Sequence, residues 1–257
     1  MRKFLILICM CIGIIGVAIA DSINLNWYVD GNIYDTSTCT IGDDIILPTT
    51  PTKRGYTFLG WVNCTPIEYI ESTGTQYIDT GISAPNGYRA HIKFVITEKT
   101  NNMIGIIGSH NSSSPWGRNV LFGYNGGLRL GAGGVYAITD LSIINSNVII
   151  ELVFSTFVND IYVTNHNLSN LSNGEDINST RSSNNLWLFG VCGYSPAEKL
   201  KGKIYFVQIW DINNTLVRDF IPVLDSDGVA CMYDKVSGTF FYNSGSGNFI
   251  AGPVISK

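Results

Sequence analysis

Charge is scarce in this sequence of 257 residues. Only 14% of the residues are Asp, Glu, Lys or Arg, and 20 acidic against 16 basic side chains give a formal net charge of −4. After the first three residues, Lys and Arg occur next to each other only at Lys53-Arg54, whereas binding to a phosphate backbone normally requires clustered cations. The composition therefore argues against a nucleic acid as the partner.

Residue patterns for catalysis and metal binding are missing as well. The chain has three histidines, His91, His110 and His166, and none lies near a GxSxG motif or a catalytic cysteine signature. No CxxC, HxH or HExxH spacing occurs, although these are the arrangements by which cysteine and histidine usually hold zinc. We therefore predict no metal, no cofactor and no nucleophilic catalysis.

Carboxylates that could cleave a glycosidic bond are few. The stretch IEYIESTGTQYIDTGI, residues 67–82, holds Glu68, Glu71 and Asp79. Glycoside hydrolysis requires two carboxylates facing each other across the bond, roughly 5–10 Å apart. Because strand side chains alternate between faces, Glu68 and Glu71 are expected on opposite faces. We predict that the chain is not an enzyme, and keep a glycoside hydrolase with an unrecognised site as a second alternative.

One acidic turn has the beginning of a calcium-binding loop. Asp225-Ser226-Asp227-Gly228 offers oxygen ligands at suitable starting positions, but Val236 stands where such a loop has its bidentate glutamate. Asp and Gly are also common residues of tight turns. We therefore favour a turn over an ion site.

The first twenty residues, MRKFLILICMCIGIIGVAIA, have the features of a secretory signal peptide. Arg2 and Lys3 precede an apolar run, and Ala18-Ile19-Ala20 forms a small-residue cleavage pattern before Asp21. The run is short for a bilayer core, which takes about 20 apolar residues. We predict a signal peptide over residues 1–20, a secreted or cell-surface location, and no stable membrane span after cleavage.

Four cysteines follow the signal peptide: Cys39, Cys64, Cys192 and Cys231. An even number in a secreted chain makes disulfides plausible, although four cysteines allow three pairings. Cys39 and Cys64 bracket a segment too small to form a large core, so we favour that bond, which for such a loop stabilises by about 3 kcal/mol. Cys192 and Cys231 would form the second bond.

Hydrophobic alternation with a period of two dominates after residue 22, and no stretch sustains a period of 3.6 residues. This pattern predicts an all-β protein. Asp30-Gly31 lies between two strand-like runs and predicts a hairpin. A loop bounded by prolines and a strand with Tyr56, Phe58 and Trp61 follow, so residues 21–64 are expected to form a small β-rich module.

Within this module, GDDIILPTTPTKRGYTFLGW, residues 42–61, resembles the internalin-type B repeat, a small β-rich repeat of bacterial surface proteins. The match rests on Gly42-Asp43, Leu47-Pro48, Pro51, Gly55-Tyr56-Thr57-Phe58 and Gly60-Trp61. The resemblance implies a bacterial protein located at the cell exterior. A single copy and two flanking cysteines distinguish this chain from the tandem arrays of that family.

Residues 66–253 carry strand signals throughout, separated by Gly, Asn, Ser and Asp turns as in large antiparallel sandwiches. Hairpins are expected around Asn125-Gly126-Gly127 and around Lys235-Val236-Ser237-Gly238. The polar segment 165–185 has no period and is expected to be a loop.

Three stretches of this region, IEYIESTGTQYIDTGI, KIYFVQIWD and TLVRDFIPVLDSDGVACMYDKVSGTFFYNSGSGNF, resemble the laminin-G-like jelly roll of the concanavalin A-like lectin and glucanase superfamily. The resemblance implies an antiparallel two-sheet jelly roll over residues 66–253. It does not decide the activity, because the superfamily contains lectins, adhesion modules and hydrolases. The ExDxxE pattern of its glucanases is absent from this sequence.

Aromatic and cationic residues in two Gly-rich hairpins are the candidates for ligand binding. A sugar ring presents an apolar C–H face and hydroxyl groups, which suit an aromatic platform beside guanidinium and amide donors. The candidates are Trp116, Arg118, Tyr124, Arg129 and Tyr136. The alternative is that Trp116 and Tyr136 only cover the sandwich. Strand patterns place three other tryptophans in the core, namely Trp61, Trp187 and Trp210.

Together these patterns predict a secreted or cell-surface protein that recognises a glycan or acts in adhesion without catalysis. The first alternative is a structural spacer of the cell surface with protein partners.

Overall fold

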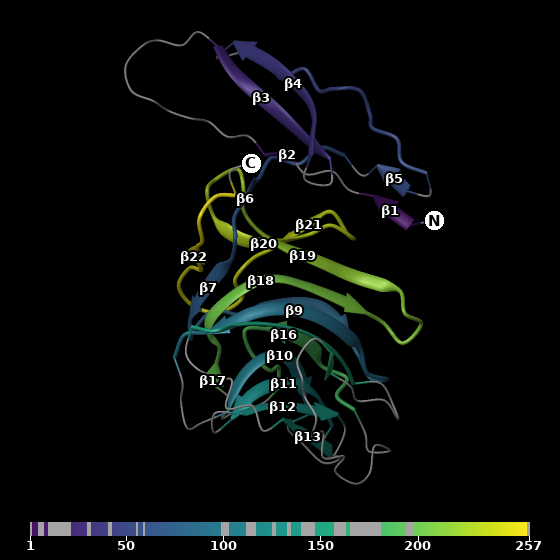
Figure 1. The fold of residues 1–257 in the computed structure, drawn as a ribbon, viewed down its shortest axis with the longest axis vertical. Coiled ribbons are helices and arrows are strands. Elements are labelled where there is room, and N and C mark those ends of the chain that lie inside the picture. Colours follow the sequence, from purple (N-terminus) through teal and green to yellow (C-terminus); the bar gives the residue numbers. More distant parts are fainter. Residues whose placement is uncertain are drawn as a thin grey trace.

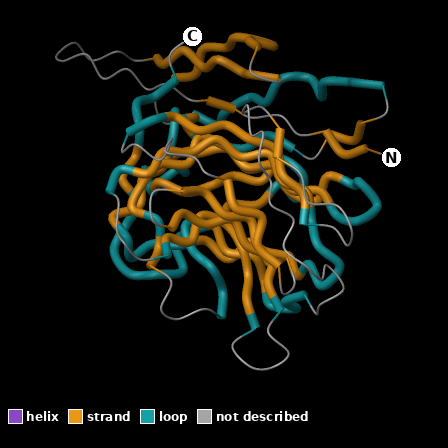
Figure 2. The backbone as a smooth tube through the Cα atoms, turned by 60° about the horizontal axis from the view of Figure 1, so that its bottom comes forward, coloured by secondary structure: helices purple, strands orange, loops and turns teal. Residues whose placement is uncertain are grey.

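The structure is a computed structural model of the chain. It describes residues 2–4, 8–9, 22–29, 32–40, 43–54, 56–58, 60–98, 103–111, 117–124, 127–132, 135–139, 147–156, 163–164, 181–193 and 198–255. Within these ranges the chain forms strands and loops and no helix, so the all-β prediction is confirmed (Figure 2).

Two large sheets stack face to face as a sandwich (Figure 1). The seven-stranded sheet runs β13 (Val135–Thr139), β12 (Gly127–Ala132), β11 (Arg118–Tyr124), β10 (Ile104–His110), β16 (Asn185–Leu188) and β8 (Ile78–Ser83), with β17 (Glu198–Lys199) beside β10. The ten-stranded sheet runs β15 (Val163–Thr164), β14 (Ile149–Ser155), β9 (Arg89–Ile96), β18 (Lys201–Trp210), β19 (Leu216–Leu224), β20 (Ala230–Asp234) and β21 (Thr239–Phe241), joined by β6 (Thr65–Pro66), β7 (Ile70–Thr73) and β22 (Ile250–Ala251).

The core lies between these sheets because their strands alternate in burial. On β9, Ala90, Ile92 and Phe94 are buried, whereas His91 and Lys93 between them are only half-buried. The strands of the other sheet contribute a matching set of buried side chains, among them Ile78, Ile107, Leu121, Leu130, Leu186 and Leu188. Full burial of each such side chain stabilises the fold by roughly 1.5–3 kcal/mol.

The motif that follows Ile70 carries the chain from one sheet to the other. At this corner Ser72 Oγ donates a hydrogen bond to Gln76 Oε1 at 3.0 Å, and the Thr73 backbone N–H donates to the same oxygen at 2.8 Å. Gly74 has a φ of +101°, a conformation that favours glycine. The sequence STGTQ is therefore the corner between β7 and β8.

The strands before residue 60 form two small sheets over one side of the sandwich (Figure 1). They are β2 (Ile8–Cys9), β3 (Ser22–Val29) and β4 (Asn32–Thr40) in one sheet, and β1 (Arg2–Phe4) with β5 (Tyr56–Phe58) in the other. Leu25, Trp27 and Cys39 form a small buried cluster, against which the half-buried Trp61 packs. Signal cleavage after Ala20 stays a prediction and would remove β1 and β2. In the part of the chain with described structure, no helix has the length and apolar character to cross a membrane.

The predicted hairpins are confirmed. Strands β3 and β4 pair with Val29 opposite Asn32, and β11 and β12 pair with Tyr124 opposite Gly127. Strands β20 and β21 pair with Asp234 opposite Thr239. The strand pairing therefore agrees with the hairpins that the turn residues predicted.

The predicted disulfides are not present, because Cys39, Cys64, Cys192 and Cys231 form no disulfide bond in the structure. The Cys39 thiol instead donates hydrogen bonds to the carbonyl oxygens of Thr40, at 3.3 Å, and Asp43, at 3.7 Å. Cys64 packs in a different cluster, on the outer face of the ten-stranded sheet, together with Val223, Cys231 and Tyr233. The small module is thus held by two apolar contacts, one around Trp61 and one around Cys64, in place of the expected Cys39–Cys64 bond.

Candidate functional site

The outer face of the seven-stranded sheet gathers aromatic and polar side chains at β8 and β16. Leu186 and Leu188 of β16 point into the core, so the alternate residues Asn185 and Trp187 lie on the opposite face. Trp187 stands opposite Asp79 of β8 in the register. These residues therefore share one surface.

Two aromatic rings stack on this surface. The ring centroids of Tyr77 and Trp187 lie 3.9 Å apart with an angle of 26° between the planes, and both side chains are half-buried. The Lys199 ammonium lies 5.5 Å from the Tyr77 ring centroid. The indole Nε1 of Trp187 is buried and has no hydrogen-bond partner. A buried N–H without an acceptor is rare in native proteins, and a bound ligand or water would supply one.

A carboxylate and a carboxamide border the aromatic pair. Asp79 Oδ1 accepts hydrogen bonds from the Gly81 backbone N–H at 2.8 Å and from Asn185 Nδ2 at 3.1 Å. The β8–β16 register shifts between Asn185 and Trp187, and Gly81 takes a φ of +67° at this bulge. The bulge thus fixes Asp79 and Asn185 beside Trp187. We name this surface the aromatic patch; its members are Tyr77, Asp79, Asn185, Trp187 and Lys199.

Cys192 borders the aromatic patch. Burial, and to a smaller extent the negative charge of Asp79, raises the pKa of its thiol. A thiol with a raised pKa is a poor nucleophile near neutral pH. Cys192 therefore has no activated character.

The residues predicted to bind ligand are only partly brought together. Trp116 lies outside the described residues. Phe122 pairs with Arg129, and Val120 with Gly131, which in turn pairs with Tyr136. Since side chains alternate, the backbone positions of Arg118, Tyr124, Arg129 and Tyr136 share one face of β11, β12 and β13.

That face is covered at its centre. Val120 and Phe122 are buried and pack with Val191 and the half-buried Met103. Gly105 of β10 permits this cover, because a Cβ there would lie 2.8 Å from Val191 Cγ2 and 2.9 Å from the Gly190 backbone. Part of the predicted platform is therefore packed against the crossing segment 190–191.

The prediction that three tryptophans are core residues is wrong for two of them. Trp187 belongs to the aromatic patch, and Trp210 is half-buried with the Arg89 guanidinium 4.1 Å from its ring centroid. Both occupy the outward positions of their strands. Hydrophobic alternation shows that a strand has two different faces, but when both faces carry large apolar residues it does not show which of them packs in the core. Trp61 packs against the cluster of the small module.

The three carboxylates of the opening motif do not form one group. Glu71 lies on β7, with Lys203 Nζ 3.9 Å away, whereas Asp79 belongs to the other sheet. Burial raises the pKa of Tyr205, and Glu68 and Glu71 both add to this shift, so both carboxylates lie near that phenol. Glu68 precedes the first residue of β7, Ile70, and strict alternation does not extend to it. The argument that Glu68 and Glu71 point to opposite faces of a strand therefore does not hold. The prediction of no catalysis rests on the missing catalytic motifs alone.

The acidic loop after β19 is built as a turn. Asp225 Oδ1 accepts hydrogen bonds from the backbone N–H groups of Asp227 at 2.9 Å and Val229 at 2.8 Å. Asp225 Oδ2 accepts a third bond from the Tyr242 hydroxyl at 2.9 Å, and burial together with this contact raises the pKa of Tyr242 to about 12. Both carboxylate oxygens thus hold the loop in place, as expected for turn chemistry.

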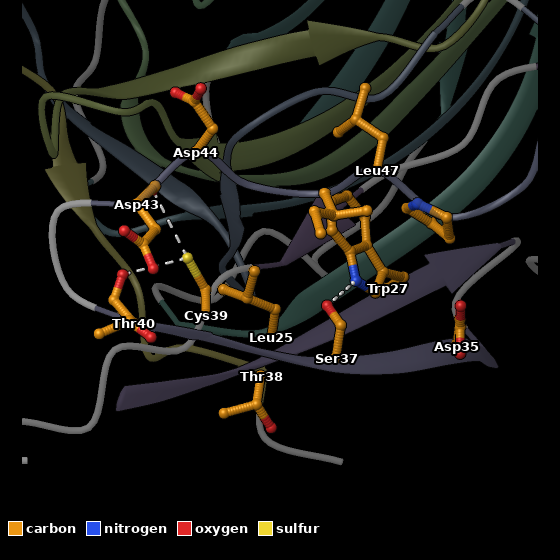
Figure 3. Close-up of a pocket in the computed structure, with 12 residues that line it drawn as sticks. Leu25, Trp27, Asp35, Ser37, Thr38, Cys39, Thr40, Asp43, Asp44 and Leu47 are labelled. Atoms are coloured by element: carbon orange, nitrogen blue, oxygen red, sulfur yellow. Dashed lines mark hydrogen bonds between the residues drawn. The ribbon is translucent and has the colours of Figure 1, made fainter. Parts of the chain in front are cut away.

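A second candidate site is a hollow of about 340 Å³ in the small module (Figure 3). Trp27 forms part of its wall and donates a hydrogen bond from Nε1 to Ser37 Oγ at 2.8 Å. Ile46 and Leu47 line its rim and are 84% and 59% exposed. The other lining residues are Leu25, Asp35, Thr38, Cys39, Thr40, Asp43, Asp44 and Pro48. The hollow therefore joins an apolar rim to acidic side chains.

Comparisons of the chain with protein families, with curated proteins and with solved structures found no match.

Proposed function

We propose that this is a secreted or cell-surface bacterial protein that binds a glycan, without catalysis, through the aromatic patch. The observation that carries the proposal is the half-exposed Tyr77–Trp187 stack beside the Asp79–Asn185 pair. Aromatic faces bind the apolar face of a sugar ring, while carboxylate and amide groups bind its hydroxyls. The resemblance to laminin-G-like jelly rolls and to internalin-type repeats supports the same class of function.

The chemistry of the patch suits an uncharged ring with several hydroxyl groups. The unpartnered indole Nε1–H of Trp187 is a donor for one sugar oxygen. The Lys199 ammonium, next to Tyr77, is a second donor at the edge of the patch. Because Asp79 and Asn185 already bond to each other and to the β8 bulge, they form a fixed border that needs little ordering when the ligand binds.

The test compares two half-buried tryptophans on opposite sheets, Trp187 and Trp210. Trp187→Ala should weaken glycan affinity by about tenfold or more, as expected for an aromatic residue at the centre of a binding surface. Trp210→Ala, on the other sheet, is the matched control and should retain affinity. A glycan array identifies the ligand with the wild-type protein, and calorimetry then measures both variants. Equal affinity of the two variants for that glycan would refute the proposal.

Adhesion through a protein partner is the second candidate, and the hollow of the small module favours it. Ile46 and Leu47 at its rim are exposed apolar side chains, and exposed apolar surface of this kind is common at protein interfaces. A folded wild-type protein that binds no glycan on the array would favour this function. Turnover of a polysaccharide, lost when a single carboxylate is replaced, would instead reveal a hydrolase.

A further inference from the structure

One end of the sandwich holds a buried arginine without a partner. Arg181 is 5% exposed, and its Nε, Nη1 and Nη2 atoms form no hydrogen bond. Burial lowers the pKa of the Arg181 guanidinium. A guanidinium stays charged under ordinary conditions, and leaving a buried charge uncompensated is strongly unfavourable. Among the residues that the structure describes, Arg181 therefore has no counter-charge.

The backbone at Arg181 and Ser182 is held against the start of β11 and the end of β8. A Cβ on Gly117 would lie 2.6 Å from the Arg181 carbonyl carbon, so the two backbones are in contact just before β11. Asn119 Nδ2 donates to the Ser182 carbonyl at 3.2 Å and to the Ala84 carbonyl at 2.8 Å. These bonds tie the segment around Arg181 to β11 and to the end of β8.

Two further buried polar atoms in this region have no partner. Asn119 Oδ1 and Ser109 Oγ are buried and form no hydrogen bond, and the two residues stand opposite each other in the β10–β11 register. The two bonds from Asn119 Nδ2 to carbonyl oxygens require that Oδ1 be the free atom of this amide. Arg181, Ser109 and Asn119 are thus three buried polar side chains without partners, and Arg181 is the charged one among them.

We propose that Arg181 anchors an anion site that takes the carboxylate or sulfate group of an acidic glycan. Planar guanidinium groups bind such oxyanions through two parallel hydrogen bonds. The inference rests on the proposed function, since Arg181 lies four residues before Asn185 and six before Trp187 of the aromatic patch.

The experiment measures Tm with sodium glucuronate, sodium sulfate, glucose or sodium chloride, with all three salts at matched ionic strength. Glucuronate should raise Tm by roughly 5 °C at a concentration far above its Kd, and glucose should not. Arg181→Met should abolish the rise, and Arg181→Lys should reduce it because lysine lacks the planar fork. Arg54→Met, which replaces an exposed arginine of the small module, is the control and should keep it.

The salts separate the two sources of negative charge. Sulfate stabilises many proteins without specific binding, so the informative quantity is the difference between the wild type and Arg181→Met. A difference with glucuronate alone assigns a carboxylated sugar, and a difference with sulfate alone assigns a sulfated one. If Arg181→Met fails to fold, calorimetric titration of glucuronate and sulfate into the wild type replaces the comparison.

The inference is overturned if neither anion raises Tm beyond sodium chloride, or if Arg181→Met responds as the wild type does. This outcome is separable from failure of the proposed function. If Trp187→Ala weakens glycan binding but no anion raises Tm, the proposed glycan function stands and only the anion site is rejected.

Discussion

Three aspartates show how single side chains close the turns of the sandwich. Asp211 and Asp225 each accept backbone hydrogen bonds, through Oδ1, from the residues two and four positions later. Asp234 accepts from the Val236 N–H through Oδ1 and from the Ser237 N–H through Oδ2. An acidic residue at the start of such a loop is a local signal, and the sequence could predict it. Only the structure shows that Asp234 is fully buried.

Replacing Asp234 by alanine should be strongly destabilising. Its carboxylate accepts bonds from the Asp219 N–H at 2.8 Å, from Val236 and from Ser237, and Arg218 Nε lies 3.7 Å away. Without this buried carboxylate, the part-buried hydrogen bonds of the turn and the contact with Arg218 are lost together, so we expect the free energy of unfolding to fall by about 3–5 kcal/mol. Urea unfolding measures this loss.

The control for this prediction is Asp227→Ala, because Asp227 is an exposed aspartate in the neighbouring turn. Its replacement should change stability by less than about 0.5 kcal/mol. Equal losses in the free energy of unfolding for the two variants would show that the hydrogen bonds of Asp234 do not stabilise the fold more than an exposed aspartate does.

At the scale of the strand, glycines decide where elements pass close to one another. Strand β18 is the centre of the ten-stranded sheet and pairs with both β7 and β9. Gly202 lies in that strand opposite Ser72 on one side and Ile96 on the other. A Cβ at this position would lie 2.0 Å from the Val95 carbonyl oxygen. The sequence shows a glycine inside a strand pattern but not the backbone that requires it.

Gly202→Ala should therefore destabilise the sandwich. The clash is with backbone of the paired strand, which cannot rotate away as a side chain could, so we expect a loss of about 3 kcal/mol. Gly190→Ala is the control, since a Cβ at Gly190 would lie 3.7 Å from its nearest neighbouring atom, Lys199 Cγ, which is an ordinary contact distance. Thermal unfolding of both variants checks the difference, and a Tm for Gly202→Ala at or above that of Gly190→Ala would contradict it.

The elements themselves follow from the sequence to different degrees. Period-two alternation and turn residues suffice for β9, β18 and the three hairpins, because burial of one face and turn geometry are local properties. The aromatic patch required more. Tyr77 and Trp187 are far apart in the sequence and meet only because β8 and β16 are neighbours, and the bulge at Gly81 sets how Asp79 faces them. Pairing of distant strands has no local signature.

At the scale of the whole molecule, the small module is joined to the sandwich by apolar contacts. Cys64 and the half-buried Val62 pack on the outer face of the ten-stranded sheet, against Val223 and Tyr233. This contact explains why a segment with a limited core needs no covalent closure. Cysteine counting favoured disulfides because it takes no account of where each thiol is buried.

We therefore expect the stability of the purified protein to be independent of reducing agent. Cys39 and Cys64 lie in separate clusters, and Cys192 is half-buried beside the aromatic patch. Burial raises the pKa of Cys231 to about 12, which keeps its thiol protonated and unreactive in the native protein. Tm measured with and without dithiothreitol should agree, and alkylation after unfolding without reductant should label Cys39, Cys64, Cys192 and Cys231. The control is alkylation of the native protein, in which Cys231 should be protected.

A fall in Tm on reduction would show that a disulfide forms, which would contradict the prediction. Cys64 and Cys231 share one cluster, so they would then be the first pair to map by mass spectrometry.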